Sequence, residues 1–360
     1  MRKIAFLSNL SSLCSAALLC TGLALGSSPS LAAASAPPKT EAGSQAMIDA
    51  LSRANAGVVG LQVTAADGAR SIQTLGKQRT GSGVVINAEG LILTIGYLML
   101  EAENISITTA DNKTMPARAV AYDLATGFGL IKPLLPMRGA QAVALGSSEG
   151  MKAGDTLMAS VGAQGNADGD VHMTQLVSKR PFSGYWEYHI DTALFTSPPI
   201  GINGGNHSGA PLFNSKGELL GIGSLFVMDA MGRNVRLPGN MFVPVDLLKP
   251  ILAELQEKGM SAQSRRPWLG LTSSEQEGRV QIVRVNQDSP AANAGLKPGD
   301  VVLAVDNANV ATLEAFYKKL WDRASPVADV SLTVLQGAEL KTIVLKPVDR
   351  MGTMLRPAGI

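Results

Sequence analysis

Short apolar runs separated by turn residues dominate the chain between residues 58 and 160. The runs at 83–86 and 91–94 are joined by the turn Asn87-Ala88-Glu89-Gly90, which is typical of a β-hairpin. Similar runs are found at 58–63, 105–108, 117–122, 128–132 and 156–160. Many short strands with few helices between them predict a mostly β chain, built as a barrel or a sandwich.

Three segments have the spacing of helices instead. Residues 44–55 place Met47, Leu51 and Ala54 on one side, and residues 246–258 carry a similar series of Leu and Ile. Residues 313–321 predict a third helix inside a second set of strands that begins near residue 266. With 360 residues, the chain has the length of two domains.

The N-terminus has the order of a secretory signal. Arg2 and Lys3 precede an apolar stretch at 13–25, and small residues follow at 30–36. We expect a signal peptide over residues 1–34, a linker over 35–45 and export of the mature chain. The alternative is an uncleaved anchor, but the stretch is interrupted by polar residues and shorter than the roughly 20 residues of a membrane span. We expect no membrane span in the mature chain.

Composition excludes several other classes of function. The 31 basic and 29 acidic residues give a net charge of +2, which offers no basic face for nucleic acid. Both cysteines, Cys14 and Cys20, lie inside the signal, so the mature chain has no disulfide or thiolate site. The three histidines (His172, His189 and His207) lack metal-ligand spacing. We therefore expect neither a metal nor a cofactor.

Three segments resemble HtrA-type serine proteases. They are TGSGVVINAEGLILT at 80–94, HSGAPLFNSKGELLGI at 207–222 and MFVPVDLLKPILAELQEKG at 241–259. The resemblance implies a trypsin-like double β-barrel over residues 46–260 and a small α+β PDZ domain over 266–347. Residues 348–360 would then be a C-terminal tail, and the compartment would be the periplasm.

The resemblance also assigns the catalytic positions. Hydrolysis by this family uses a serine nucleophile, a histidine base and an aspartate that orients the base. The serine position matches Ser208. The segment Leu93-Thr94-Ile95-Gly96-Tyr97 has Tyr97 in place of the histidine, and Asp123-Leu124-Ala125-Thr126-Gly127 has Gly127 in place of the aspartate.

These replacements predict a poor catalyst. A phenol has a pKa of about 10 and is protonated near neutral pH, and glycine has no carboxylate. In the oxyanion region, Asn206 stands where the family has a glycine. His207 adjoins Ser208 and is an alternative base, although neighbouring side chains usually diverge. We therefore expect the chain not to be an enzyme, with serine endopeptidase activity through Ser208 as the alternative.

The second domain carries the most specific resemblance. DSPAANAGLKPGDVVLAVDN at 288–307 is similar to the centre of an HtrA-type PDZ domain, and Leu269, Gly270 and Leu271 match its carboxylate-binding loop. Such a domain adds a peptide to the edge of a sheet and holds the peptide's carboxylate with backbone N–H groups. Leu313, Phe316 and Leu320 recur at helical spacing and either line the peptide pocket or belong to the core.

Three functions are compatible with these observations. The first is a non-proteolytic protein that binds peptide C-termini or unfolded exported proteins through the PDZ domain and the barrel surface. The second is a weak serine endopeptidase that uses Ser208. The third is a regulatory or scaffold partner of another, active HtrA-type protease.

Overall fold

The computed structural model describes residues 39–137, 141–163, 169–201, 206–232 and 235–355. The expected signal peptide at 1–34 lies outside these residues. The expected linker at 35–45 is wrong from residue 39 onward, because helix α1 (Lys39–Asn55) begins there. The polar residues before Ser44 include good helix formers and extend the predicted helix backwards. No helix among the described residues is long and apolar enough to cross a membrane.

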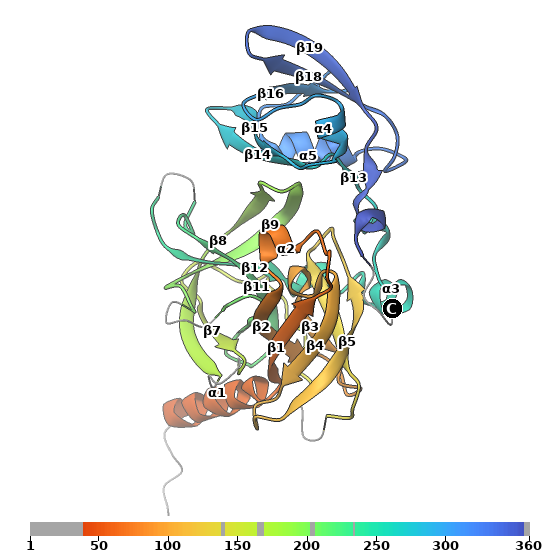
Figure 1. The fold of residues 1–360 in the computed structure, drawn as a ribbon. Helices are drawn as coiled ribbons and strands as arrows, with labels where there is room; N and C mark the ends of the chain where they lie inside the picture. The colour runs from red at the N-terminus through yellow and green to blue at the C-terminus, as the bar shows by residue number, and fades with distance from the viewer. Residues whose placement is uncertain (1–38, 138–140, 164–168, 202–205, 233–234, 356–360) are drawn as a thin grey trace, which may run out of the picture. The chain divides into compact units, whose positions relative to one another are not determined.

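The first half of the chain forms a closed barrel of antiparallel strands (Figure 1). Around the barrel the strands follow the order β1-β2-β3-β6-β5-β4. Six of the seven predicted apolar runs fall within or overlap these strands, and the run at 156–160 belongs to the second barrel. The strands are β1 (Val58–Ala65), β2 (Gln78–Val85), β3 (Ile92–Ile95), β4 (Ala102–Thr108), β5 (Thr114–Tyr122) and β6 (Phe128–Pro133). Two short helices, α2 (Ile72–Leu75) and η1 (Gly96–Met99), follow β1 and β3.

A second closed barrel has the same number of strands, in the order β10-β11-β12-β9-β8-β7. Its strands are β7 (Thr156–Val161), β8 (Asp170–Gly184), β9 (Tyr188–Ser197), β10 (Pro211–Phe213), β11 (Leu219–Val227) and β12 (Gly239–Pro244). The predicted double β-barrel is therefore confirmed.

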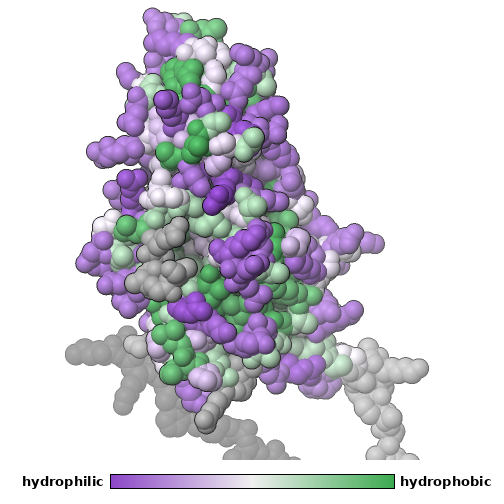
Figure 2. Space-filling model, turned by 90° about the vertical axis from the view of Figure 1, so that its right-hand side faces the viewer, coloured by the Kyte–Doolittle hydropathy of each residue, from purple (hydrophilic) through white to green (hydrophobic). Residues whose placement is uncertain are grey.

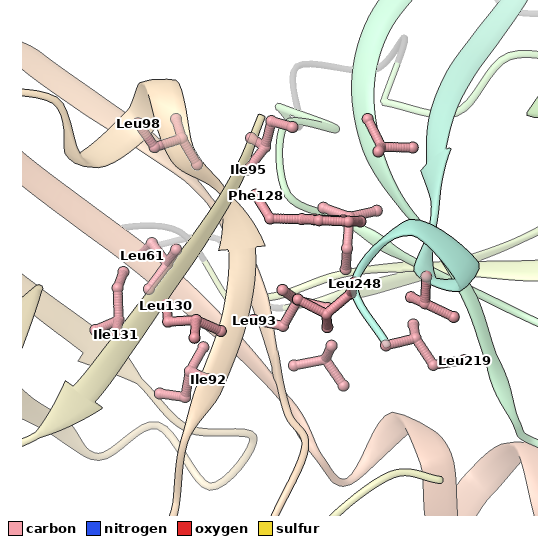
Figure 3. Packing of buried hydrophobic residues seen from close by; sticks show 14 of the residues in the cluster. Leu61, Ile92, Leu93, Ile95, Leu98, Phe128, Leu130, Ile131, Leu219 and Leu248 are labelled. Atoms are coloured by element: carbon pink, nitrogen blue, oxygen red, sulfur yellow. The ribbon is translucent and has the colours of Figure 1, made fainter. Parts of the chain in front are cut away.

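The two barrels share one buried hydrophobic cluster. Figure 3 shows Phe128 and Leu93 of the first barrel in the same cluster as Leu219 and Leu248. Leu219 begins β11 of the second barrel, and Leu248 lies shortly after β12. All four side chains are fully buried. Burial of each such side chain contributes about 1.5–3 kcal/mol, so the cluster fixes the first barrel against the second.

The helix predicted over 246–258 is broken in the structure. A 3-10 turn, η2 (Val245–Leu247), is followed by α3 (Leu252–Lys258). Pro250 lies between them, and proline interrupts a helix because it lacks an N–H and its ring clashes with the preceding turn. A further 3-10 turn, η3 (Ala262–Ser264), leads into the second domain.

The second domain is an antiparallel sheet with strand order β14-β15-β16-β18-β19, and β14 forms one edge. Its elements are β14 (Leu271–Gln276), β15 (Arg279–Val285), α4 (Pro290–Asn293), β16 (Val301–Val305), β17 (Ala308–Asn309), α5 (Leu313–Trp321), β18 (Val330–Gln336) and β19 (Glu339–Leu345). The helix predicted at 313–321 is α5.

The molecular surface is mixed in character. On the face shown in Figure 2, hydrophobic side chains lie among hydrophilic ones.

The expected tail at 348–360 is wrong over its first part. Residues Val348–Asp349 form β20, which pairs with β13 (Pro267–Trp268). A 3-10 turn, η4 (Arg350–Thr353), follows. The pairing satisfies backbone groups of the segment and holds it against the start of the second domain.

Candidate functional site

Ser208 and Tyr97 meet between the two barrels. Tyr97 lies in η1, directly after β3, and Ser208 lies just before β10. The Tyr97 Oη atom is 2.7 Å from the Ser208 Oγ atom and 2.8 Å from the carbonyl oxygen of Ser224 in β11. Ser208 is 7% exposed. The structure therefore places the phenol of Tyr97 beside the hydroxyl of Ser208.

The phenol has one proton for two neighbours. A carbonyl oxygen only accepts, so when Tyr97 donates to Ser224, the Ser208 hydroxyl donates to the phenol oxygen. In that arrangement the phenol oxygen is the group that receives the serine proton. Burial raises the pKa of Tyr97 to about 12, and the contact with Ser208 lowers it only in part. The phenol is thus a proton acceptor only in its rare ionised form.

Gly127 is a strained and crowded position for a side chain. It ends the turn before β6 with φ of +84°, a conformation that favours glycine. A Cβ atom at this position would lie 3.3 Å from the Tyr188 hydroxyl, which donates to the carbonyl of Thr126 at 2.6 Å. The Gly96 N–H donates to the Gly127 carbonyl at 2.7 Å, so Gly127 does lie beside the turn that carries Tyr97.

Asp123 does not replace the missing acid. Its buried carboxylate accepts from the N–H and hydroxyl of Thr126 and from the hydroxyls of Ser261 and Ser264. These contacts tie the turn before β6 to the segment that leads into the second domain. Asp123 is therefore a structural turn residue.

The side chain of Asn206 covers the oxyanion region. The Ser208 N–H donates to Asn206 Oδ1 at 2.9 Å, and Asn206 Nδ2 donates to the Thr80 carbonyl at 2.7 Å. A glycine at this position would leave the Ser208 N–H free to bind an oxyanion. An oxyanion at Ser208 must displace this carboxamide to use that donor.

His207 is not directed at the nucleophile. Its imidazole bonds the backbone of Leu225, and Nε2 is buried with no partner among the described residues. Burial lowers the pKa of His207, which disfavours the charged form of the ring. Among the described residues, the Ser208 hydroxyl contacts Tyr97 and not His207. Tyr97 is therefore the side chain that lies closest to the Ser208 proton.

The loop Leu269-Gly270-Leu271 holds a carboxylate. Its three successive N–H groups donate to the side chain of Glu187 at 3.1, 2.8 and 2.8 Å. Glu187 follows β8 in the second barrel and is 6% exposed. Burial raises the pKa of Glu187, and the three N–H donors act in the opposite direction.

The helical positions behind this loop are buried. Leu313, Phe316 and Leu320 in α5 all belong to the hydrophobic cluster of the second domain, together with Leu271. Their neighbour Tyr317 directs its hydroxyl at the carbonyl of Gly184 at 2.8 Å. Tyr317 therefore contacts the barrel at the end of β8, and Lys318 of the same helix contacts Asp191 of β9 at 2.6 Å.

Comparison with known proteins agrees with this architecture. Residues 81–222 match the trypsin-like peptidase domain and residues 267–346 match the PDZ domain. A probable periplasmic serine endoprotease, DegP-like, from Halomonas elongata is 28% identical over 281 residues, covering 75% of this chain. A protein of the same description from Hahella chejuensis is 27% identical over 299 residues, covering 78%.

This chain is a trypsin-like peptidase homologue with a PDZ domain, related to the DegP and HtrA proteins. It spans 56% and 60% of the length of the two relatives. The solved structure of the serine endoprotease from Yersinia pestis has a TM-score of 0.52 at 23% identity, covering 86% of this chain and 98% of its own. A structure described as the HtrA-type protease AlgW with tripeptide gives the same values.

The relatives correct one prediction. The expectation that the chain is not an enzyme is contradicted, because the homologues are named serine endoproteases. The replaced residues change the groups around Ser208, but Ser208 itself remains at the nucleophile position with the Tyr97 hydroxyl in hydrogen-bond range. Replacement of the family histidine was therefore not a sufficient reason to exclude enzymatic activity.

One group of acidic and histidine side chains has ligand-like spacing. His189, Asp191 and Glu314 have oxygen or nitrogen atoms within 4.8 Å of one another. The Lys318 ammonium lies 2.6 Å from Asp191 and 2.8 Å from Glu314, so a cation from the chain already neutralises them. The group is an ion-pair network.

Three residues of these sites were not among those predicted from the sequence. Ser224 contributes a backbone carbonyl, which has no side-chain signal. Tyr188 and Glu187 belong to the run Tyr185-Trp186-Glu187-Tyr188, an acidic residue among aromatic ones at the turn between two strands. The cluster of Tyr and Trp was the available signal, because these residues are enriched at interfaces.

Proposed function

We propose that this chain is a periplasmic protein that binds the C-termini of exported polypeptides through its PDZ domain and hydrolyses them slowly with Ser208. The observation that supports binding is the convergence of three successive N–H groups on one carboxylate. The signal-like N-terminus and the periplasmic relatives support the compartment.

The binding chemistry is strand addition with a charged end. A peptide beside edge strand β14 gains main-chain hydrogen bonds, and its terminal carboxylate accepts from Leu269, Gly270 and Leu271. Hydrogen bonds to an ionised acceptor are about twice as strong as neutral ones. The free carboxylate is therefore the main feature of the ligand, and the apolar residue before it supplies contact area.

Slow hydrolysis follows from the Ser208–Tyr97 contact. The Ser208 oxygen attacks the peptide carbonyl carbon as its proton passes to the Tyr97 phenolate. The resulting oxyanion is stabilised by the Ser208 N–H once Asn206 has moved, and the leaving amine takes the proton from the phenol. Water then hydrolyses the acyl-enzyme by the same route. With a pKa of about 12, the phenolate fraction at pH 8 is only about 10⁻⁴.

This pair does not need the missing acid. An imidazole must be held in one tautomer and becomes charged when it takes the proton, and the family aspartate serves both needs. A phenolate has one acceptor atom and becomes neutral on protonation. The neutral phenol then donates a hydrogen bond to the Ser224 carbonyl until the leaving amine takes its proton.

The test measures binding of the full chain to a decapeptide ending in leucine, by calorimetry. The peptide with a free α-carboxylate is expected to bind at least about tenfold more tightly than its C-terminally amidated twin, because amidation removes the charged acceptor. Equal affinities would overturn the peptide-binding function. Cleavage of casein at pH 9 that equals that of Ser208→Ala would overturn the hydrolytic one.

A further inference from the structure

The turn between β8 and β9 makes the contacts of a bound peptide. This turn, Tyr185 to Glu187, is called the hairpin tip here. The Ser273 N–H of edge strand β14 donates to the Tyr185 carbonyl at 2.8 Å. From the other side, the Tyr317 hydroxyl of α5 donates to the Gly184 carbonyl at 2.8 Å and lies 3.3 Å from the Glu187 nitrogen. The tip is thus held between β14 and α5.

The order of these contacts is antiparallel to β14. The Leu271 N–H donates to the Glu187 side chain, and the N–H of Ser273, two residues later, donates to the backbone carbonyl of Tyr185, two residues earlier. A peptide added to the edge of β14 would bond alternate residues of this strand in the same way. The carboxylate of Glu187 completes the likeness, because it lies at the end of this register on the N–H groups of the loop.

The tip adopts a strained conformation to make these contacts. Glu187 has φ of +57°, in the left-handed region that side chains other than glycine rarely occupy. Its carboxylate is buried, and both oxygens accept hydrogen bonds from the loop. A strained residue with a buried charge persists only where the surrounding contacts hold it, which marks this position as a specific contact.

We infer that the hairpin tip is an internal ligand of the PDZ domain, in which the Glu187 carboxylate occupies the place of a peptide's C-terminal carboxylate. An incoming peptide binds by displacing the tip from β14 and from the loop. The inference rests on the PDZ peptide site of the proposed function and adds that this site is filled by the chain itself.

Displacement sets the apparent affinity of a peptide. If the loop is free in only a fraction of molecules, the apparent dissociation constant rises by the inverse of that fraction. Occupation of about 90% would weaken peptide binding about tenfold. Removal of the Glu187 carboxylate should therefore raise the affinity for a peptide about tenfold, without any change in the loop.

The first experiment measures docking with no peptide present. Hydrogen exchange of the Leu269 to Leu271 amides is followed in the full chain, in Glu187→Ala and in Glu89→Gln, a control at an exposed turn of the first barrel. Exchange at the loop should be at least tenfold faster in Glu187→Ala than in the other two. Unchanged protection of β18 and β19 shows that the domain remains folded.

The second experiment measures competition by fluorescence anisotropy with the leucine-ended decapeptide and its amidated twin. Glu187→Ala should bind the free peptide at least tenfold more tightly than the unmodified chain, and Glu89→Gln should not. If Glu187→Ala prefers the free peptide but binds it no more tightly than the unmodified chain, the internal ligand is overturned and the proposed site stands. If no variant prefers the free peptide, the peptide site itself is overturned, whatever the exchange rates.

Discussion

The carboxamide of Asn206 gives a direct way to raise the activity of Ser208. In Asn206→Gly, the Ser208 N–H loses the acceptor that lies 2.9 Å away and becomes available to an oxyanion. Displacing one neutral hydrogen bond costs about 0.5–1.5 kcal/mol. Because each 1.36 kcal/mol is tenfold in rate, the variant should hydrolyse peptides roughly 2- to 13-fold faster.

The same change should weaken the fold. Asn206 also donates to the Thr80 carbonyl, so two hydrogen bonds are lost, worth about 1–3 kcal/mol together. The assay compares cleavage of a fluorogenic peptide with urea unfolding. Asn214→Gly is the matched control, since Asn214 Oδ1 accepts from the N–H groups of Lys216 and Glu218 away from the oxyanion position.

Asn214→Gly should lose stability without gaining activity. If Asn206→Gly is no faster than the unmodified chain although it is folded, the carboxamide does not obstruct an oxyanion and the reasoning is refuted. If both variants become faster, the gain comes from loosening the second barrel, which refutes it equally.

Two further variants test the fold around the site. Gly127→Asp should lower the free energy of unfolding by about 1 kcal/mol or more, measured by thermal denaturation, because φ is +84° and Tyr188 lies 3.3 Å from the new Cβ. The control Gly150→Asp, which has open space around its Cβ, should leave the free energy of unfolding unchanged in the same assay. Phe128→Ala, in the cluster shared by the barrels, should cost about 3–5 kcal/mol by urea unfolding, and a cost below 1 kcal/mol would contradict the shared core.

Much of the scaffold could be predicted because its determinants are local. The apolar runs and turns of the first barrel each specify one strand, and the hairpin turn at 87–90 sets its own register. The place of Tyr97 after β3 follows from the same register, so the Tyr97–Ser208 contact could be anticipated from the aligned motifs. Pro250 indicates a helix break in the sequence, but the apolar periodicity on both sides of it predicts one continuous helix.

The rest of the site depends on contacts between residues far apart in sequence. Glu187 is separated by 82 to 84 residues from the amides that it meets, and nothing local to it specifies that partner. The closure of the oxyanion region depends on the rotamer of Asn206, and the filling of the acid position depends on Tyr188 arriving from β9. Such long-range side-chain placements follow from tertiary packing rather than from periodicity.

The role of Tyr97 is tested most directly by the pH dependence of Ser208-dependent hydrolysis, measured as the rate of the unmodified chain minus that of Ser208→Ala. Burial raises the pKa of Tyr97 to about 12, so the folded chain keeps this proton at a pH where the unfolded chain loses it. The corresponding stability is present below about pH 10 and is lost as the pH rises toward about 12. The assay therefore runs from pH 7 to pH 10.

Below the pKa the phenolate fraction rises tenfold per pH unit. The difference rate should rise by the same factor across the whole range, about 1,000-fold in total, and Tyr97→Phe should abolish the rise. A rate that levels off near pH 7, as for an imidazole base, or a rise that persists in Tyr97→Phe, would contradict the assignment of Tyr97 as the proton acceptor of Ser208.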